Sequence, residues 1–453
     1  MAVSSLAVFL AFLDVTIVNI AFPAITAAFP ESSLGGLSWV VTAYNVAFAA
    51  LLVPAGRLAD MRGRRRVFRW GLVLFAVASA ACALAPTVSA LVAARVLQAV
   101  AAALITPSSL ALLLPAFPPQ RRGVAVGTWG AMGGIAAAAG PAIGGVLVDA
   151  LGWRAVFLVN VPLALLALAA GWRVLAESRD DRATMPDAAS TVLLGAGVAL
   201  LALGVVNGEN GWVSAGALAP IGAGLVLLAA FVLRGRRVPN PLVELGLFRV
   251  RAFAGATAGY LLFSAAFYAL LLANVLFLTG VWRYDVLVAG LAVTPGPLMA
   301  ALGSTVGGRF ADRFGALAPI VTGGVLFAVG CALLAARTAD APAYVTTFLP
   351  ATLLTGAGVG LVFSGLGAAQ VAQLPAHRYA TGSAVGTCAR QIGAVLGIAL
   401  LLSGLAAAGS SAGAFHLAWL VMAAGGVAAA VAGLVIGPVR AGAASAEPIP
   451  AEG

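Results

Sequence analysis

The stretch Gly56-Arg-Leu-Ala-Asp-Met-Arg-Gly-Arg-Arg-Arg-Val67 separates two long apolar segments and decides how the chain is organised. Its charges are too closely spaced for the stretch to enter hydrocarbon, so it must stay at a membrane surface. The pattern Gly-Arg-x-Ala-Asp-x-x-Gly occurs again at Gly308–Gly315, also between two apolar segments. This repeated loop motif predicts a chain built from two related halves, as many transporters are.

The composition excludes an ordinary soluble protein. Hydrophobic residues make up 62% of the chain and charged residues only 9%, whereas about 25% of residues are charged in soluble domains. The net charge of +10 comes from arginines in short loops, so no nucleic-acid partner is predicted. The three cysteines fall inside apolar segments and the two histidines have no ligand partner nearby. We therefore expect neither a disulfide nor a metal site.

Apolar segments long enough to cross a membrane follow one another along the chain. Lipid-facing backbone must satisfy its own hydrogen bonds, and the alternation typical of a barrel strand is missing, so these segments are predicted helices. The predicted fold class is an all-α integral membrane protein with about fourteen transmembrane helices. The segments are residues 3–24, 37–56, 68–86, 89–114, 122–148, 154–175, 188–206, 215–233, 252–280, 286–308, 317–336, 343–371, 379–405 and 414–437.

Polar stretches at Glu177–Asp187 and Arg234–Pro241 bracket two of these helices and leave six on each side. This division agrees with the repeated loop motif. We expect an N-terminal six-helix bundle at 1–180, two additional linker helices at 181–250, a C-terminal six-helix bundle at 251–438 and a disordered cytoplasmic tail at 439–453.

The arginines predict the orientation in the membrane. If the Gly56–Val67 loop is cytoplasmic, most of the 25 basic residues lie on that side, and only Arg154, Arg283 and Arg337 lie on the other. Loops on the cytoplasmic side carry an excess of positive charge. We therefore expect a multi-pass protein of the bacterial cytoplasmic membrane with both termini in the cytoplasm.

Three ionisable residues lie deep inside predicted spans, namely Asp14, Arg95 and Arg390. A charged group at membrane depth is costly and is a functional candidate by default. Helix geometry places Asp14 and Arg95 within about 5 Å of the same depth, which predicts either a proton-coupling pair or a purely structural ion pair. Arg390 either binds a ligand or is fully paired with backbone carbonyls. Asp60 and Asp312 lie at span ends, where helix capping is the simpler interpretation.

The fifth span is rich in glycine and contains Pro141. Glycine allows close helix approach and proline removes a backbone hydrogen bond, so this span is predicted to pack tightly or to bend as a gate. No nucleotide-binding loop, zinc-protease motif or serine-hydrolase motif occurs in the sequence. An enzyme is not expected, and neither is a pump driven by ATP.

Seven stretches together resemble the major facilitator superfamily, in its fourteen-span drug–proton antiporter branch of multidrug efflux permeases. The first helix has Leu-Asp-Val-Thr-Ile-Val-Asn-Ile-Ala-Phe-Pro at 13–23. The other matching stretches are Gly56–Val67, Leu91–Gln98, Gly140–Gly145, Pro241–Leu245, Ala289–Leu291 and Arg390–Gly393. Two positions depart from the family pattern, because Ala99 and Ala136 stand where glycine is usual.

The resemblance implies two pseudo-symmetric six-helix bundles plus two extra helices. It also implies export of small amphipathic compounds in exchange for protons, by alternating access and without a cofactor. The substrate, protons and the lipid bilayer would be the partners of a monomer, and an adaptor protein is left open. The implied roles are proton coupling for Asp14 and Arg95; a gating latch for Gly56, Asp60, Arg62, Gly63, Arg64 and Arg65; an antiporter motif for Gly140, Pro141, Gly144 and Gly145; and cavity positions for Asn19, Gln98, Arg390 and Gln391.

Other functions remain open at this point. Proton-coupled uptake of a metabolite would use the same scaffold, and the Gly140–Gly145 motif argues against it. A non-transporting membrane sensor would normally carry a soluble signalling domain, and a membrane enzyme would need clustered polar residues. The deep charges sum to one excess positive charge, because Glu209 falls in a loop and Asp285 at a span end. We therefore expect neutral, zwitterionic or weakly anionic substrates rather than dications.

Overall fold

The computed structural model describes residues 2–113, 122–175, 177–179, 185–208, 211–374, 379–408 and 412–439, and most of these are helical. The first group of helices is α1 (Ala2–Ala28), α2 (Leu34–Arg62), α3 (Arg64–Leu84), α4 (Val88–Leu113), α5 (Arg122–Leu151), α6 (Ala155–Leu158), α7 (Asn160–Val174), α8 (Ala188–Asn207) and α9 (Ala215–Gly235). The second group is η4 (Leu245–Arg249), α10 (Arg251–Gly280), α11 (Val286–Val293), α12 (Pro295–Phe314), α13 (Leu317–Arg337), η5 (Tyr344–Phe348), α14 (Leu349–Ala372), α15 (Tyr379–Ala408) and α16 (Ala412–Ile436). Glu209 and the tail predicted to be disordered, from residue 440 onward, lie outside the described residues.

The number of spans agrees with the sequence. Thirteen helical stretches within the described ranges are apolar and long enough to cross a membrane. Three of them combine two elements each, α6 with α7, α11 with α12, and η5 with α14. The 30-residue helix α5 adds one more, because it is long enough to cross a bilayer and ends in the apolar stretch Ala139–Leu151. The expectation of about fourteen spans is confirmed.

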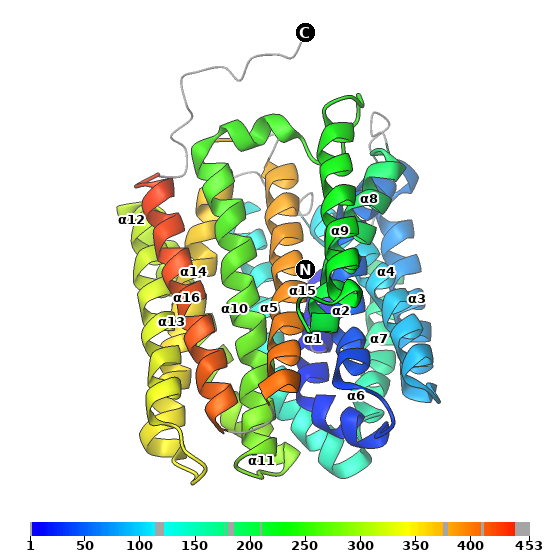
Figure 1. Cartoon of the computed structure of the whole chain (residues 1–453). Helices are drawn as coiled ribbons and strands as arrows, with labels where there is room; N and C mark the ends of the chain where they lie inside the picture. The colour runs from blue at the N-terminus through cyan, green and yellow to red at the C-terminus, as the bar shows by residue number, and fades with distance from the viewer. Residues whose placement is uncertain are drawn as a thin grey trace.

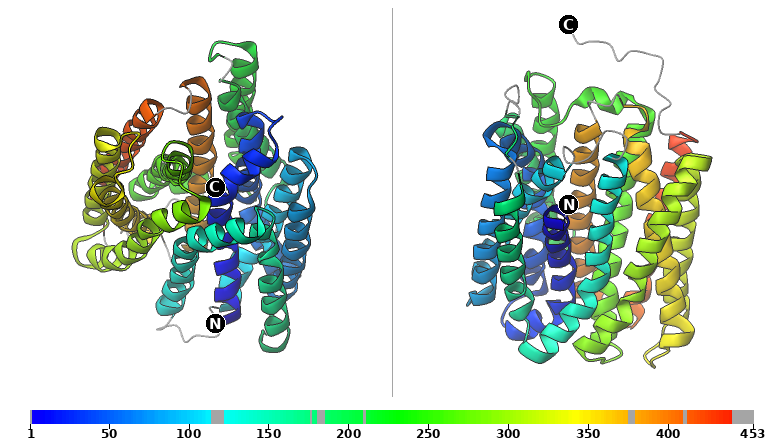
Figure 2. Two further views of the ribbon diagram at one scale, coloured as in Figure 1. Left: turned by 90° about the horizontal axis from the view of Figure 1, so that it is seen from below. Right: turned by 180° about the vertical axis from the view of Figure 1, so that it is seen from behind.

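The helices stand side by side, with the early helices at one side and the late ones at the other (Figure 1). Helices α3, α4 and α7 lie opposite α12, α13 and α16, and α5 and α15 lie between these groups, as the view from behind also shows (Figure 2). Contacts between α2 and α15, between α5 and α11, and between α1 and α10 join the two sides. The predicted boundaries at residues 180, 250 and 438 remain predictions.

Helices α8 and α9 form a hairpin at the edge of this arrangement. Helix α8 packs on α2 and α15, whereas α9 packs mainly on α8 and buries only Ala217 and Gly224. Asp187 joins the ends of the hairpin, because its carboxylate accepts hydrogen bonds from Arg234 at 2.5 and 2.8 Å and from the Ser190 backbone N–H at 2.8 Å. The Arg234 and Ser190 hydrogen bonds hold the pKa of the Asp187 carboxyl well below its usual range.

The repeated loop motif ends a helix in both halves. Gly63 follows α2 with φ of 104°, and Gly315 follows α12 with φ of 82°. Their N–H groups donate to the carbonyls of Ala59 and Ala311 at 3.0 and 2.9 Å. The last glycine of the motif therefore ends the helix with a positive φ, which residues that carry a Cβ atom rarely adopt.

The two aspartates of the motif, Asp60 and Asp312, do not cap a helix as the sequence predicted. Asp60 and Asp312 lie inside the last turns of α2 and α12, where neither is an N-cap. Hydropathy marks where a helix leaves the membrane, and both helices continue beyond that point to Arg62 and Phe314. The capping interpretation of these two residues was wrong for that reason.

Close contact between α10 and α15 depends on glycine. A Cβ atom at Gly397 would lie 2.0 Å from the carbonyl oxygen of Ala265, and one at Gly393 would lie 2.2 Å from that of Leu261. The backbones of the two helices therefore touch directly, as glycine allows in membrane bundles. At Gly404, on the same helix α15, a Cβ atom would meet nothing within 4 Å.

We predict that Gly397→Ala destabilises the protein by about 1–3 kcal/mol, the usual cost of overpacking. The matched variant Gly404→Ala should be neutral, because its new methyl group has open space. Thermal stability of the purified protein in detergent, followed by size-exclusion chromatography after heating, measures both. Equal melting temperatures for the two variants would contradict the close α10–α15 contact.

Candidate functional site

Asp14 on α1 is the centre of a buried polar cluster. Its side chain is fully buried, and its Oδ2 accepts a hydrogen bond from Arg95 Nη1 on α4 at 2.5 Å. Its Oδ1 accepts from Gln98 Nε2 on α4 and from Asn160 Nδ2 at the start of α7, both at 2.8 Å. Two helices, α4 and α7, thus supply three donors to one carboxylate on α1.

Arg95 is held at several of its atoms. Its Nε donates to the backbone carbonyl of Val40 on α2 at 2.9 Å, and its Nη1 also donates to Gln98 Oε1 at 2.6 Å. The guanidinium carbon lies 4.2 Å from the centroid of the Tyr44 ring, in cation–π distance. Only 1% of the residue is exposed. These contacts fix the position of the positive charge beside Asp14.

The arrangement suits an ionised carboxylate. All three side chains that contact Asp14 donate hydrogen bonds to it, and a carboxylate only accepts them. A protonated carboxyl group has to donate one bond, and Arg95 has no acceptor atom to receive it. Binding a proton at Asp14 therefore requires at least one of these contacts to rearrange.

The sequence predicted part of this cluster. Asp14, Arg95 and Gln98 were singled out, and the structure brings them together. Asn160 and Ser79, whose Oγ accepts from Gln98 Nε2 at 2.8 Å, were not singled out. Asn160 could have been found as a lone amide in an apolar span, because polar groups at membrane depth are costly. Nothing in the sequence distinguishes Ser79 from other serines.

The antiporter motif on α5 packs against two helices at once. A Cβ atom at Gly140 would lie 2.1 Å from Thr16 Oγ1, and one at Gly144 would lie 2.8 Å from Ile17, both on α1. Toward α11, a Cβ atom at Gly145 would lie 3.0 Å from the Cα atom of Leu287. Helix α5 therefore joins α1, which carries Asp14, to α11 in the other half of the chain.

Pro141 completes the contact with α11. Its carbonyl oxygen would lie 2.4 Å from a Cβ atom at Gly290, which is part of the predicted Ala289–Leu291 stretch. Two of the stretches quoted from the sequence thus meet in space. They do so near α6 and α11, at the lower end in Figure 1, which is the arginine-poor end of the helices.

The latch residues lie at the opposite, arginine-rich end. Asp60 pairs with Arg64 at 2.8 Å, which is one helical turn away in sequence. Gly63 packs against Glu177, and Arg64 N–H donates to the Ser178 carbonyl at 2.9 Å. Glu177 and Ser178 follow α7, in the same half.

No hydrogen bond or ion pair links this latch to the other half within the part of the chain that the structure describes. Arg62 is exposed, and Arg65 donates to the carbonyl of Trp172 on α7. Gly56 lies beside Pro107 of α4, again in the same half. Every hydrogen bond and ion pair of these latch residues that the described residues show therefore lies within the first half of the chain.

The remaining cavity candidates differ from one another. Gln391 on α15 donates to Asn45 Oδ1 on α2 at 3.3 Å, which joins the two halves. Asn19 donates to Val15 in its own helix, and its Oδ1 is buried without a partner. Spare hydrogen-bonding capacity is therefore found at Asn19 Oδ1 on α1 and at Asn45 Nδ2 on α2, beside Gln391.

Arg390 has no hydrogen bond or ion pair among the described residues, and its Nε is buried without a partner. Its guanidinium carbon lies 5.5 Å from the Phe12 ring centroid and 5.9 Å from that of Phe363. The alternative of full pairing with backbone carbonyls is thus contradicted. Arg390 is a cation framed by aromatic rings from both halves of the chain.

Comparisons with known proteins agree with this architecture. The sequence profile of the Major Facilitator Superfamily matches residues 4–191. "Multidrug resistance protein Stp" of Mycobacterium tuberculosis is 35% identical over 406 residues, which cover 89% of this chain and 75% of that protein. The "Tetracenomycin C resistance and export protein" of Streptomyces glaucescens is 35% identical over 391 residues, 86% of this chain and 72% of that protein.

A solved structure shares the fold. The xylose transporter XylE from E. coli, in a partially occluded inward-open conformation, matches with a TM-score of 0.63 at 14% sequence identity. The match covers 95% of this chain and 96% of that one. This multi-pass membrane protein therefore belongs to the major facilitator superfamily, whose members move small molecules across lipid bilayers.

Proposed function

We propose that this chain exports small amphipathic compounds across the bacterial cytoplasmic membrane in exchange for protons. The buried Asp14 cluster carries the proposal, because a carboxylate held by Arg95 at membrane depth is a site that can exchange a proton only with a rearrangement. The printed names of two relatives, one for multidrug resistance and one for resistance and export, support the direction. The proton gradient drives the cycle, and neither a cofactor nor an enzymatic step is required.

The coupling step takes place between Asp14 and Arg95. When a proton arrives at Asp14, the negative charge that holds Arg95 disappears, and the guanidinium keeps only neutral partners such as the Val40 carbonyl and Gln98. A buried charge without its counter-charge is strongly unfavourable. Protonation therefore favours a different arrangement of α1 against α4 and α7, and release of the proton restores the present one.

Helix α5 connects this step to the gate. Its Gly140 and Gly144 contact α1 at Thr16 and Ile17, within one turn of Asp14, while Pro141 and Gly145 contact α11 across the halves. These contacts close the arginine-poor end, whereas among the described residues the latch around Asp60 has no hydrogen bond or ion pair to the other half. The positive-inside rule favours a cytoplasmic position for the arginine-rich end, so our proposal places both termini there and assigns this arrangement to an inward-facing state.

Arg390 contributes to the substrate site. It lies against Phe12, two residues before Asp14 on α1, so the substrate site and the proton site share one helix. A desolvated guanidinium without a counter-charge attracts carboxylate, phenolate or carbonyl oxygen atoms, and its aromatic frame suits an apolar body. The substrate class is therefore neutral to weakly anionic amphipathic compounds.

The first prediction concerns Asp14→Asn. Substrate-driven proton release from the purified protein should fall to background, because asparagine cannot exchange a proton. The control Asp340→Asn removes a carboxylate from an exposed loop between α13 and η5 and should release protons normally. Normal proton release by Asp14→Asn would show that the Asp14–Arg95 pair is structural only.

The same protein tests the direction of transport. In vesicles of known orientation, an imposed proton gradient should drive substrate out of the compartment that corresponds to the cytoplasm. Movement of substrate and protons in the same direction would identify an uptake symporter instead.

A second prediction concerns the latch. Asp60→Ala should lower the transport rate about fivefold or more while substrate affinity changes little, because it shifts the balance between two states and leaves the substrate site intact. Transport assays with equilibrium binding on the same preparation separate the two effects. Loss of binding with an unchanged maximal rate would place Asp60 in the substrate site.

A third prediction concerns substrate charge. Arg390→Ala should reduce protection of a pump-deficient host against phenolic or carboxylate antibiotics about tenfold, since a hydrogen bond to a charged group contributes about 1.5–3 kcal/mol. Arg337→Ala, which removes an exposed arginine at the end of α13, is the matched control. Strong protection against dicationic biocides that is insensitive to Arg390→Ala would overturn this substrate class.

A further inference from the structure

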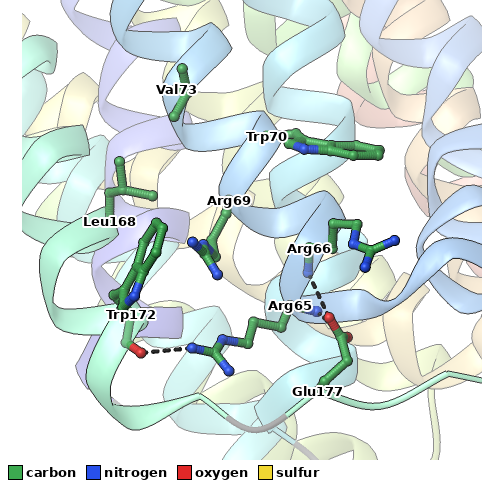
Figure 3. Close-up of a pocket in the computed structure, with 8 residues that line it drawn as sticks. All are labelled: Arg65, Arg66, Arg69, Trp70, Val73, Leu168, Trp172 and Glu177. Carbon is green, nitrogen blue, oxygen red and sulfur yellow. Dashed lines mark hydrogen bonds between the residues drawn. The ribbon is translucent and has the colours of Figure 1, made fainter.

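A pocket of about 460 Å³ lies on the outer side of α3 and α7, away from the Asp14 cluster. Figure 3 shows the residues that line it. They are Arg65, Arg66, Arg69, Trp70 and Val73 of α3, Leu168 and Trp172 of α7, and Glu177. The pocket opens at the arginine-rich end, where α3 begins and α7 ends.

The pocket is positively charged. It contains three arginines and one carboxylate, and that carboxylate accepts the backbone N–H groups of Arg65 and Arg66 at 3.0 and 3.1 Å rather than a guanidinium. The Arg69 guanidinium carbon lies 3.2 Å from the centroid of the Trp172 ring. Among the described residues, no acidic side chain pairs with the guanidinium of Arg66 or Arg69. Both can still bind an anion.

Arg65 adds a donor that faces no partner. Its Nη2 donates to the Trp172 carbonyl at 2.7 Å, while its Nε is buried and makes no hydrogen bond. A buried unsatisfied donor is costly, so a shift of the Arg65 side chain that brings its Nε to a ligand oxygen would be favourable. The site therefore offers charge and hydrogen-bonding capacity together.

The deeper part of the pocket is apolar. Val73 lies eight residues after Arg65 on α3, which corresponds to about 12 Å along the helix toward the membrane interior. Val73 is 47% exposed and Trp70 48% exposed, so these side chains face outward into the lipid. Two tryptophans at the helix ends mark the level of the lipid headgroups. Charge at the surface and apolar lining below match the two parts of a phospholipid.

We propose that this pocket binds an anionic phospholipid. Its phosphate binds at the arginine-rich mouth of the pocket, which Arg66 and Arg69 line, and an acyl chain follows Val73 and Leu168. A soluble anion would use the arginines and leave the apolar lining without a function. A zwitterionic lipid carries its own positive charge, which the arginines repel. The pocket shares Arg65 and Glu177 with the latch region, but contains neither the Asp14 cluster nor Arg390.

Native mass spectrometry of the full-length protein in detergent tests this site, with phosphatidylglycerol and phosphatidylcholine as probes. The parent protein should retain one phosphatidylglycerol molecule more tightly than phosphatidylcholine. Because each arginine near a membrane surface strengthens anionic lipid binding roughly fivefold, the double variant Arg66→Gln/Arg69→Gln should bind about 25-fold more weakly. Size-exclusion chromatography establishes that the variant is folded.

The matched control is Arg236→Gln/Arg237→Gln. It removes the same charge from two exposed arginines after α9, outside the pocket, and should retain the lipid. If both double variants lose phosphatidylglycerol binding to the same extent, net charge alone explains the loss. The proposed site would then be wrong. Equal retention of the two lipids by the parent protein would overturn the choice of an anionic lipid. Displacement of the lipid by inorganic phosphate or glycerol phosphate at equal concentration would identify a soluble anion instead.

Discussion

The ion pair between Asp14 and Arg95 is the constraint on which the arrangement of the early helices depends. Breaking a buried ion pair by neutralising one partner costs about 3–5 kcal/mol, and this pair is almost completely buried. Its contacts come from α1, α2, α4 and α7, so these helices have to converge at one depth. A change of one proton at Asp14 therefore acts on four helices at once. That is why a single carboxylate can bias a large conformational equilibrium.

Glycines on α5 and α11 let these helices pack closely on their neighbours. A movement of one helix can therefore be passed on to the next. At Gly140 and Gly290 a Cβ atom would be closer than 2.5 Å to a neighbouring helix. Gly140 packs on the Thr16 side chain and Gly290 on the Pro141 backbone carbonyl with no room for a further methyl group, so a movement of α1 is expected to displace α5. The substrate cation Arg390 contacts the same helix α1 through Phe12. Proton, substrate and gate thus share α1 and its immediate neighbours.

Hydropathy and the positions of charges predicted the spans and the depth of Asp14 and Arg95. Depth follows from counting residues along a helix, and the Asp14–Arg95 contact needed little more than equal depth. Rotation about the helix axis does not follow from a glycine-rich or uniformly apolar segment, so the contact of Asn160 with Asp14 was missed. The partners of the latch were missed for a different reason. Glu177 is more than 100 residues away from Arg65 in sequence and lies in a short polar stretch without a pattern.

The two copies of the loop motif show which part of it is structural. In both halves the turn glycine packs against the segment that follows the last helix of that half, Gly63 against Glu177 and Gly315 against Pro438. The next N–H group donates to that segment at 2.9 Å in each case, Arg64 to Ser178 and Ala316 to Val439. The backbone arrangement is thus common to both copies and explains the repeated glycines. Only the first copy adds the run Arg64–Arg66, whose backbone N–H groups at Arg65 and Arg66 donate to Glu177, so these charges serve a purpose beyond ending the helix.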